Sequence, residues 1–378
     1  MEQVRAIDAD GHITEPVDLW GKYLERRYQD LAPRFVRTPD GVDAISFLGI
    51  DHVPGNEIGL PGAGLAGKSV GPRTKYEHRY VDGHQGGFDP HARLAVMDKE
   101  GIDIAVLFPT LSAVPIAAIP DEGFATALAR AYNNWLADFC HVAPQRLFGA
   151  AQVPLLHLDA ALREVDRAVV ELDMKMIVLR PNPYAGRLWT DRAYDPLWGR
   201  LQRLNVPVAF HEGTYPKAIP TAGADRFDNF LFQHVISHPF EQQLVCLSLV
   251  AGGVLERFPR LRVAFMESGC GWLPYWLQRI DEHCEELPWM APDLTMRPSE
   301  YFRRQCFISV EAKDSEIAHV ANAIGSDRLL FASDFPHYDA VFPGAVRAFV
   351  SNCGLTRSHA MKVLADNAAQ LLGLPVTG

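Results

Sequence analysis

Residues 4–16 read VRAIDADGHITEP, and residues 329–337, near the other end of the chain, read LLFASDFPH. Each stretch is a short apolar run that ends in acidic and imidazole side chains. Asp10 and His12 are two residues apart, a spacing that puts two side chains on one face of a strand. Asp334 follows the second apolar run. Strand ends from opposite extremes of a chain meet only in a closed or strongly curved sheet, so the two stretches predict such a fold.

Eight apolar runs bounded by turn residues predict eight strands that alternate with amphipathic helices. The strands are expected at residues 4–10, 104–108, 147–153, 175–180, 207–211, 261–267, 305–310 and 328–334. The helices are expected at residues 121–141, 158–172, 194–204, 240–258, 273–283, 316–324 and 357–372. This order predicts a parallel sheet, and the count of eight favours a single (β/α)8 barrel over residues 1–378. A doubly wound open sheet is the alternative.

Two segments interrupt the repeat. Residues 35–87 are rich in glycine and proline and follow the first strand, and residues 214–239 follow the fifth. Loops this long are usually functional or disordered. Both leave the carboxyl ends of strands, where a barrel carries its active site. We expect the first insertion to act as a lid or as an arm in an oligomer.

Composition narrows the class of protein. The chain has 48% hydrophobic and 22% charged residues, a formal net charge of −10 and no run of basic residues, which disfavours nucleic acid as a partner. The longest apolar stretch, residues 244–255, is too short to span a membrane. Six cysteines without a CxxC pair, and the absence of a signal-peptide pattern, predict reduced thiols and a cytoplasmic location.

Four residues at three predicted strand ends suggest a metal site. Asp10 and His12 follow the first strand, His211 the fifth and Asp334 the eighth. Two carboxylates and two imidazoles suit zinc, manganese or a related divalent ion. Taken singly, each residue has an ordinary alternative role, such as a helix cap for Asp334 or a satisfied core imidazole for His211. Together they predict one divalent metal ion with an open position for water or substrate.

Other polar strand ends and loops complete the expected pocket. Arg180 suits a substrate carboxylate because its guanidinium binds both oxygens, although a structural ion pair with a loop acid is equally consistent. Glu267 near a metal is expected to act as a general base or to orient a ligand. We expect His238 and His337 to reach the pocket from loops, His238 as a catalytic residue and His337 as a substrate-binding residue. A helix cap or a surface imidazole is the alternative for each, and for His337 it is the favoured one.

These residues carry a resemblance to a known family. The segments DADGH (8–12), LRP (179–181), PVAFH (207–211), FPRL (258–261), FASDFPH (331–337) and NAA (367–369) resemble the amidohydrolase superfamily. They are most similar to the branch that includes aminocarboxymuconate-semialdehyde, resorcylate and carboxyvanillate decarboxylases. The resemblance spans nearly the whole chain. It implies a TIM-like barrel, one divalent metal and a homodimer or larger homo-oligomer.

The resemblance also assigns positions. After the first strand, the branch has an acid or a histidine and, two residues later, a histidine; these positions correspond to Asp10 and His12. The histidine of the branch after strand five corresponds to His211. Its aspartate after strand eight corresponds to Asp334. The decarboxylases carry a catalytic histidine after strand six, where this chain has Glu267. Decarboxylation is therefore not simply inherited. Two side chains are the candidates to take over the role of that histidine: Glu267 at the same position, or His238 moving in from its loop.

Three classes of function stay open. In a decarboxylase acting on a small aromatic or conjugated acid, Asp334 or a metal-activated water gives a proton to the carbon that bears the carboxylate. In a hydrolase, Asp334 or Glu267 takes a proton from a metal-activated water, which attacks an amide, an ester or lactone, or a C–C bond next to a carbonyl. Glu267 in place of a histidine favours hydrolysis, whereas branch membership and Arg180 favour decarboxylation, which is the function we expect. A barrel that binds a ligand without turnover would hold no metal.

Overall fold

The computed structural model describes residues 6–52, 56–111, 116, 119–184, 186–212 and 220–375. Residues 4 and 5, at the predicted start of the first strand, and residues 213–219, which include the start of the second insertion, lie outside this range. Within the described part, no helix is both long and apolar enough to cross a membrane.

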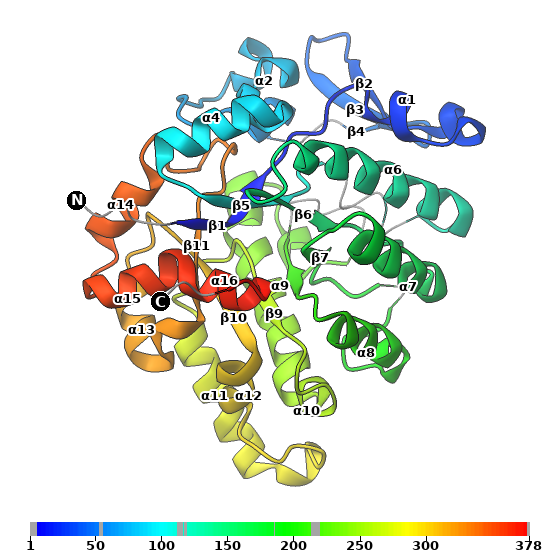
Figure 1. The fold of residues 1–378 in the computed structure, drawn as a ribbon. Coiled ribbons are helices and arrows are strands. Elements are labelled where there is room, and N and C mark those ends of the chain that lie inside the picture. Colours follow the sequence, from blue (N-terminus) through cyan, green and yellow to red (C-terminus); the bar gives the residue numbers. More distant parts are fainter. Residues whose placement is uncertain are drawn as a thin grey trace.

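Eight parallel strands form the centre of the molecule, in the order in which they occur along the chain (Figure 1). Their bounds are β1 Ile7–His12, β5 Ile104–Phe108, β6 Leu147–Ala151, β7 Met176–Leu179, β8 Val208–Phe210, β9 Val263–Phe265, β10 Cys306–Glu311 and β11 Leu329–Ala332. Each predicted strand is present, with ends that differ by a few residues at most; β1 and β10 extend past their predicted ends, to His12 and Glu311. The structure thus confirms the barrel over the open sheet.

The first and last strands meet through backbone hydrogen bonds just beyond the end of β11. The N–H of Asp334 donates to the carbonyl of Asp10 over 2.9 Å, and the N–H of His12 donates to the carbonyl of Phe335 over 2.8 Å. The Asp8 carboxylate accepts the N–H of Ser333 over 2.9 Å. These contacts close the barrel at its carboxyl-terminal mouth and bring the two quoted stretches of sequence together.

Helices surround the barrel (Figure 1). The longer ones are α4 Pro90–Glu100, α6 Glu122–His141, α7 Leu158–Asp166, α8 Asp195–Leu204, α9 Phe230–Ala251, α11 Leu273–Glu286, α12 Pro298–Gln305, α13 Ile317–Ile324 and α14 Ala345–Asn352. The chain ends with α15 Arg357–Met361 and α16 Asn367–Leu372. The short helices are α1 Leu19–Tyr23, α2 Thr74–Glu77, α3 Gln85–Phe88 and α10 Val254–Arg257. All predicted helical stretches are helical over most of their length.

The barrel interior is filled by apolar side chains. Ile7, Ala9, Val106, Phe307 and Leu330 belong to one buried cluster, and side chains of α16 join it. A second, larger cluster lies between the strands and the outer helices. The barrel is therefore a packed core, as its fold class requires, and its polar chemistry is left to the strand ends.

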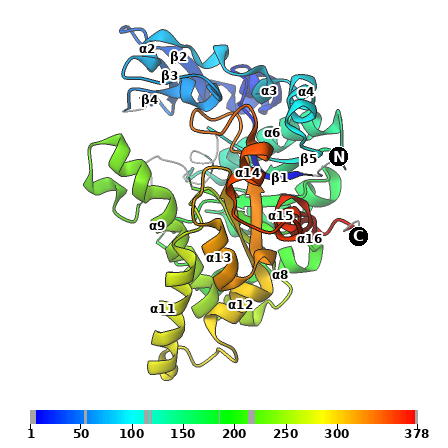
Figure 2. The same cartoon turned by 90° about the vertical axis from the view of Figure 1, so that its left-hand side faces the viewer.

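The first insertion has more secondary structure than its composition indicates. It carries an antiparallel three-stranded sheet of β2 Arg34–Arg37, β3 Asp43–Phe47 and β4 Ile50–His52, followed by short helices. Figure 2 shows this segment above the barrel, with the first turns of α9 projecting below it at the left. The predicted role as a lid or oligomer arm stays a prediction.

The second predicted insertion is partly wrong. Residues 230–239 were expected to be loop, but α9 begins at Phe230 and continues through Pro239. The Asn229 side chain caps this start by accepting the N–H of Leu231 over 2.8 Å. A proline removes only its own N–H from a helix, and here the helix continues past it. His238 therefore lies on a helix and not on a loop.

Candidate active site and metal centre

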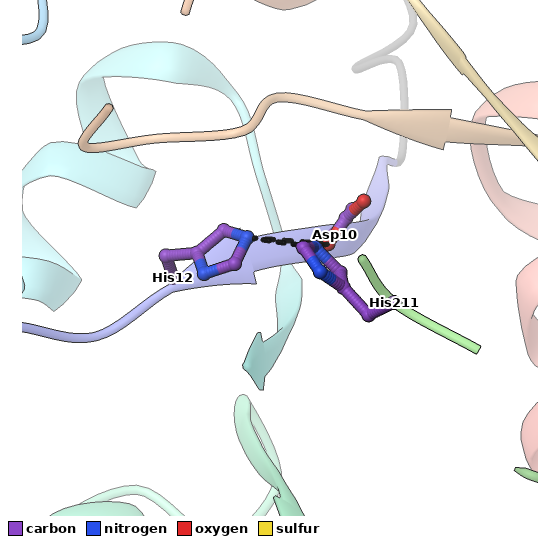
Figure 3. Close-up of side chains that lie close together, drawn as sticks. All are labelled: Asp10, His12 and His211. Carbon is purple, nitrogen blue, oxygen red and sulfur yellow. Dashed lines mark hydrogen bonds and ion pairs between the residues drawn. The ribbon is translucent and has the colours of Figure 1, made fainter. Parts of the chain in front are cut away.

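Asp10, His12 and His211 lie together at the mouth of the barrel (Figure 3). The Nε2 atom of His211 is 3.4 Å from Oδ1 of Asp10 and 3.1 Å from Nε2 of His12. The Nε2 atom of His12 is 3.6 Å from the same carboxylate oxygen. All three side chains are buried, and their nearest ligand atoms lie within 4.8 Å of one another. The structure thus brings together three of the four predicted metal ligands.

A bulge in β1 aims Asp10 and His12 into the pocket. Along β1, Asp8 pairs with Ala105, but the next pairs are Gly11 with Leu107 and His12 with Phe108, so Ala9 and Asp10 together oppose a single residue. The alternation that puts Ile7 and Ala9 inside the barrel would otherwise point Asp10 outward. The extra residue shifts the alternation, as bulges beside active sites commonly do.

Asp334, the fourth predicted ligand, approaches the same nitrogen of His12 as Asp10 does. Its Oδ1 atom is 3.5 Å from Nε2 of His12 and 2.8 Å from Nδ1 of His337. The backbone of Asp334 has a φ of +55°, an uncommon conformation for a residue other than glycine. Such strain concentrates at functional sites, where it fixes the direction of a side chain.

Glu267 lies just after β9 and, like Asp334, has a positive φ, of +45°. Its Oε2 atom is 3.3 Å from Nε2 of His211 and 3.5 Å from Nε2 of His238. The hydroxyl of Ser237 is 2.9 Å from Nδ1 of His238 and fixes the ring. His238 therefore contacts Glu267 without any movement of its segment.

Burial and neighbouring charges tune the imidazoles in opposite directions. Burial lowers the pKa of His12 well below its usual value, so the ring is neutral, the form that ligates metals. Burial also acts to lower the pKa of His337, but the Asp334 carboxylate outweighs it and raises that pKa to about 10. In the same way the Glu267 carboxylate overcomes burial and raises the pKa of His238 to about 9.

The surroundings of the Asp10 carboxylate indicate a cation. Among the described residues, its buried Oδ2 atom has no hydrogen-bond partner, and its buried Oδ1 atom faces the two imidazole nitrogens of His211 and His12 at 3.4 and 3.6 Å. Buried charges in proteins are paired or coordinate metals. With two imidazole nitrogens beside it, the carboxylate completes a nitrogen and oxygen donor set that suits a divalent metal ion. The residues present therefore fit the metal that the sequence predicts.

Comparisons with known proteins agree with this geometry. The family model described as amidohydrolase matches residues 7–374. The chain belongs to the amidohydrolase family. It is 30% identical, over 255 residues, to gamma-resorcylate decarboxylase of Rhizobium sp. (strain MTP-10005), covering 65% of this chain and 76% of that relative. These findings confirm the resemblance to the amidohydrolase-related decarboxylase branch.

Solved structures share the fold of this amidohydrolase. An amidohydrolase from Mycobacterium avium subsp. paratuberculosis K-10 superposes with a TM-score of 0.79 and 24% identity, over 99% of this chain and 100% of the other. A dihydroxybenzoic acid decarboxylase from Polaromonas sp. JS666, with bound manganese and the inhibitor 2-nitroresorcinol, has a TM-score of 0.64 and 20% identity. That alignment covers 99% of this chain and 97% of the neighbour.

Arg180 of the amidohydrolase has a carboxylate partner within the chain. Its guanidinium forms a buried ion pair with Glu212 and donates to Oδ1 of Asn182 over 3.1 Å. The ion pair with a loop acid, one of the two predicted alternatives, is thus present. Glu212 is next to His211, so Arg180 is linked to the candidate metal centre. A direct contact with substrate stays a prediction.

Sequence reasoning missed Thr110, which follows β5. Its hydroxyl donates to the carbonyl of Ile13 over 2.8 Å, and it lies 3.3 Å from Nδ1 of His12 and 3.2 Å from Nε2 of His337. Thr110 therefore links His12, a candidate metal ligand, to His337, the hydrogen-bond partner of Asp334. The only signal in the sequence is the position of Thr110 after a predicted strand, and a hydroxyl side chain at a strand end is less distinctive than a charged or imidazole side chain.

Sequence reasoning also missed the buried hydrogen bonds that hold the end of β1 next to the segment after β11. Arg93 on α4 is buried and donates to the carbonyls of His12, over 2.9 Å, and Phe335, over 3.4 Å. The Asp8 carboxylate accepts the hydroxyl of Ser333 over 2.6 Å. Both contacts tie the end of β1 to the segment after β11. An arginine on an otherwise ordinary helix gives no sequence signal for this role.

Proposed function

We propose that the chain is a metal-dependent decarboxylase of small aromatic or conjugated carboxylic acids. The observation that carries the proposal is the buried set of Asp10, His12 and His211, with Asp334 next to His12. The sequence relative with 30% identity is a decarboxylase of this kind.

The metal we propose is zinc, with manganese as the alternative, held by Asp10, His12, His211 and Asp334. When bound, such an ion would supply positive charge that stabilises the anionic oxygens of the substrate. The mixed carboxylate and imidazole set suits either metal. Manganese has further support from the Polaromonas decarboxylase, which carries it.

We assign proton delivery to Asp334. In its protonated form it gives the proton to the carbon that bears the carboxylate; the bond from that carbon to the carboxylate breaks, and carbon dioxide leaves. His337, 2.8 Å away, holds Asp334 in position and is the nearest imidazole that can return a proton to it. Glu267 and His238 form a second pair of carboxylate and imidazole, and they are the second candidates for proton transfer.

The anionic substituents of the substrate need cationic partners. We propose Arg180 and His337 for this role. Arg180 is buried next to Glu212, and a planar guanidinium can bind two carboxylates at once. His337 carries positive charge while Asp334 is ionised, because that carboxylate raises the pKa of His337 to about 10. Both side chains belong to segments that directly follow barrel strands.

The experiment that tests the proposal is a screen of hydroxybenzoates with direct detection of carbon dioxide. We expect release of carbon dioxide by the metal-loaded chain and its loss in Asp334→Asn, which keeps the shape of the side chain and removes its proton. His319→Asn, an exposed change on α13, should keep full activity. Hydrolysis of esters or lactones without carbon dioxide release would overturn the proposal.

One observation favours hydrolysis as a second candidate. Glu267 occupies the position at which the related decarboxylases have a histidine, and its carboxylate lies 3.3 Å from His211. A carboxylate at that distance from the ligand set suits a general base that takes a proton from an attacking water. The ester and lactone arm of the same screen decides between the two reactions.

We also propose a cytoplasmic homodimer or larger homo-oligomer. All six cysteines are free, which supports a reducing compartment. Light scattering of the full chain, and of a variant with the sheet β2–β4 replaced by a short linker, tests the oligomer and the role of the insertion. A monomeric full chain would contradict this part of the proposal.

A further inference from the structure

We propose that His234, His238 and Glu267 form a second cation site beside the first, with Glu267 shared between the two. The proposal goes beyond the decarboxylase function, which uses a single metal, and shares with it only the first ligand set. The ligand class is a divalent transition metal with affinity for imidazole, zinc above all.

The three side chains already face one another. His238 Nε2 is 3.5 Å from Glu267 Oε2, and His234 lies one helical turn earlier on α9. Residues four apart share a helix face, and the two imidazole rings have centroids 5.1 Å apart. One ligand atom from each residue lies within 4.8 Å of the others. Two imidazoles and a carboxylate are a donor set found in zinc enzymes.

Neighbouring groups orient two of the three ligands. Ser237 lies 2.9 Å from Nδ1 of His238, which leaves Nε2 directed at Glu267. Metal-ligating histidines usually use their second nitrogen in this way. The N–H of Glu267 donates to the hydroxyl of Ser309 over 2.9 Å, which fixes the backbone at this residue. His234 is half-buried, so the site is open to an ion from solvent.

One oxygen links the two sites. Oε2 of Glu267 is 3.3 Å from Nε2 of His211, a ligand of the first set, and 3.5 Å from Nε2 of His238 in the second. In two-metal enzymes the ions are about 3.5–4 Å apart, a separation that a shared carboxylate spans. An ion at the second site would be ligated by Glu267 and His238, so these two residues would not transfer protons. Proton transfer would then be carried out by Asp334 and His337.

The test measures bound metal on the full chain. Metal-depleted protein is equilibrated with excess zinc, separated from free ions and analysed by mass spectrometry of the metal. We expect two equivalents in the wild type and one in His234→Ala, which removes a half-buried ligand of the second site only. Glu267→Gln, which keeps the side-chain size, should also bind one equivalent. His319→Ala, an exposed histidine on α13, is the matched control and should keep two.

Manganese gives an independent readout. With Mn2+ in both sites, electron paramagnetic resonance should record exchange-coupled ions in the wild type and an isolated ion in His234→Ala. A wild type with one equivalent, or a His234→Ala variant that keeps two, overturns the second site. A wild type with no metal overturns the first site and the proposed function as well, so the two failures are distinguishable.

Discussion

The backbone N–H of Asp334 donates to the carbonyl oxygen of Asp10 over 2.9 Å. This bond joins the first and last strands of the barrel, and its two residues are also predicted to ligate one metal. A second backbone bond lies next to it, from the N–H of His12 to the carbonyl of Phe335 over 2.8 Å. The side chain of His12 also reaches Asp334, with its Nε2 atom 3.5 Å from Oδ1 of that residue. The contacts that close the barrel therefore also hold the candidate metal ligands together. Substitutions where β1 meets the segment after β11 should reduce both the stability of the fold and metal binding.

Gly11→Ala tests this coupling. A Cβ atom at Gly11 would lie 2.4 Å from Nη2 of Arg93 and 2.8 Å from Oδ2 of Asp8, both buried. Forcing atoms into a packed core costs about 1–3 kcal/mol, and the displaced side chains hold the end of β1 in place. We expect urea unfolding to report a loss of this size and metal analysis to report less bound ion.

Gly21→Ala is the control for that prediction. Gly21 is exposed in α1, and nothing lies within 4 Å of a Cβ atom added there. Alanine is favoured over glycine in helices by up to about 1 kcal/mol, so this variant should be as stable as the wild type or slightly more stable. Equal effects of the two substitutions would contradict the role of Gly11.

The barrel could be predicted because its strands are apolar runs whose ends carry turn residues. The small sheet of the first insertion could not, because β2 and β4 are short strands in a segment rich in glycine and proline. The start of α9 was missed for a related reason. Pro239 indicated a helix boundary, whereas the helix begins at the Asn229 cap and passes through the proline.

The sequence predicts which residues form the candidate site, but it does not predict which side chains contact one another. Charged or imidazole side chains at strand ends identify Asp10, His12, His211 and Asp334, and parallel strands carry such ends to one rim. Sequence does not reveal the bulge in β1 that turns Asp10 inward. Thr110 and Arg93 act through contacts with backbone and imidazole atoms of distant segments, which no local pattern predicts.

His211→Asn tests the metal centre directly. The amide cannot replace Nε2, which lies 3.4 Å from Asp10 and 3.1 Å from His12. Loss of an outer partner of a metal ligand already costs about 10–100-fold in metal affinity, and loss of a ligand should cost at least as much. We expect less bound metal and no decarboxylation, with a circular dichroism spectrum like that of the wild type. A barrel that only binds a ligand would tolerate the change.

Arg180→Met tests the ion pair with Glu212. Removing one partner of a buried pair costs about 3–5 kcal/mol, because the remaining charge loses its counter-ion. We expect urea unfolding to report a loss in this range for the single variant. The double variant Arg180→Met with Glu212→Gln should recover most of it, because the glutamine that replaces Glu212 carries no charge.

Kinetics of the double variant then isolate the substrate role. If Arg180 binds a substrate anion, KM rises while the fold is intact. An unchanged KM in a stable double variant would limit Arg180 to its structural pair with Glu212.

Glu241→Gln tests a pH dependence of stability. Burial raises the pKa of Glu241 to about 7, with a further contribution from the nearby Glu212 carboxylate. The folded state therefore holds this proton more tightly than the unfolded state, whose glutamates titrate near 4.3. Between these two values the free energy of unfolding should fall as the pH rises. A pKa shift of one unit corresponds to about 1.4 kcal/mol, and partial solvent screening leaves an expected loss on the order of 2 kcal/mol.

The glutamine side chain of this variant can still accept the backbone N–H of Ala222, the bond that Glu241 makes, but it does not titrate. We expect wild type and Glu241→Gln to have similar stability at about pH 4, below the pKa of glutamate in the unfolded state, and the variant to be more stable at about pH 8 in urea unfolding. The difference between the two proteins cancels the titration of all other groups. Exposed Glu282→Gln on α11 is the control and should follow the wild type at both pH values. If the stability of Glu241→Gln also equals that of the wild type at both pH values, Glu241 does not link folding to proton binding.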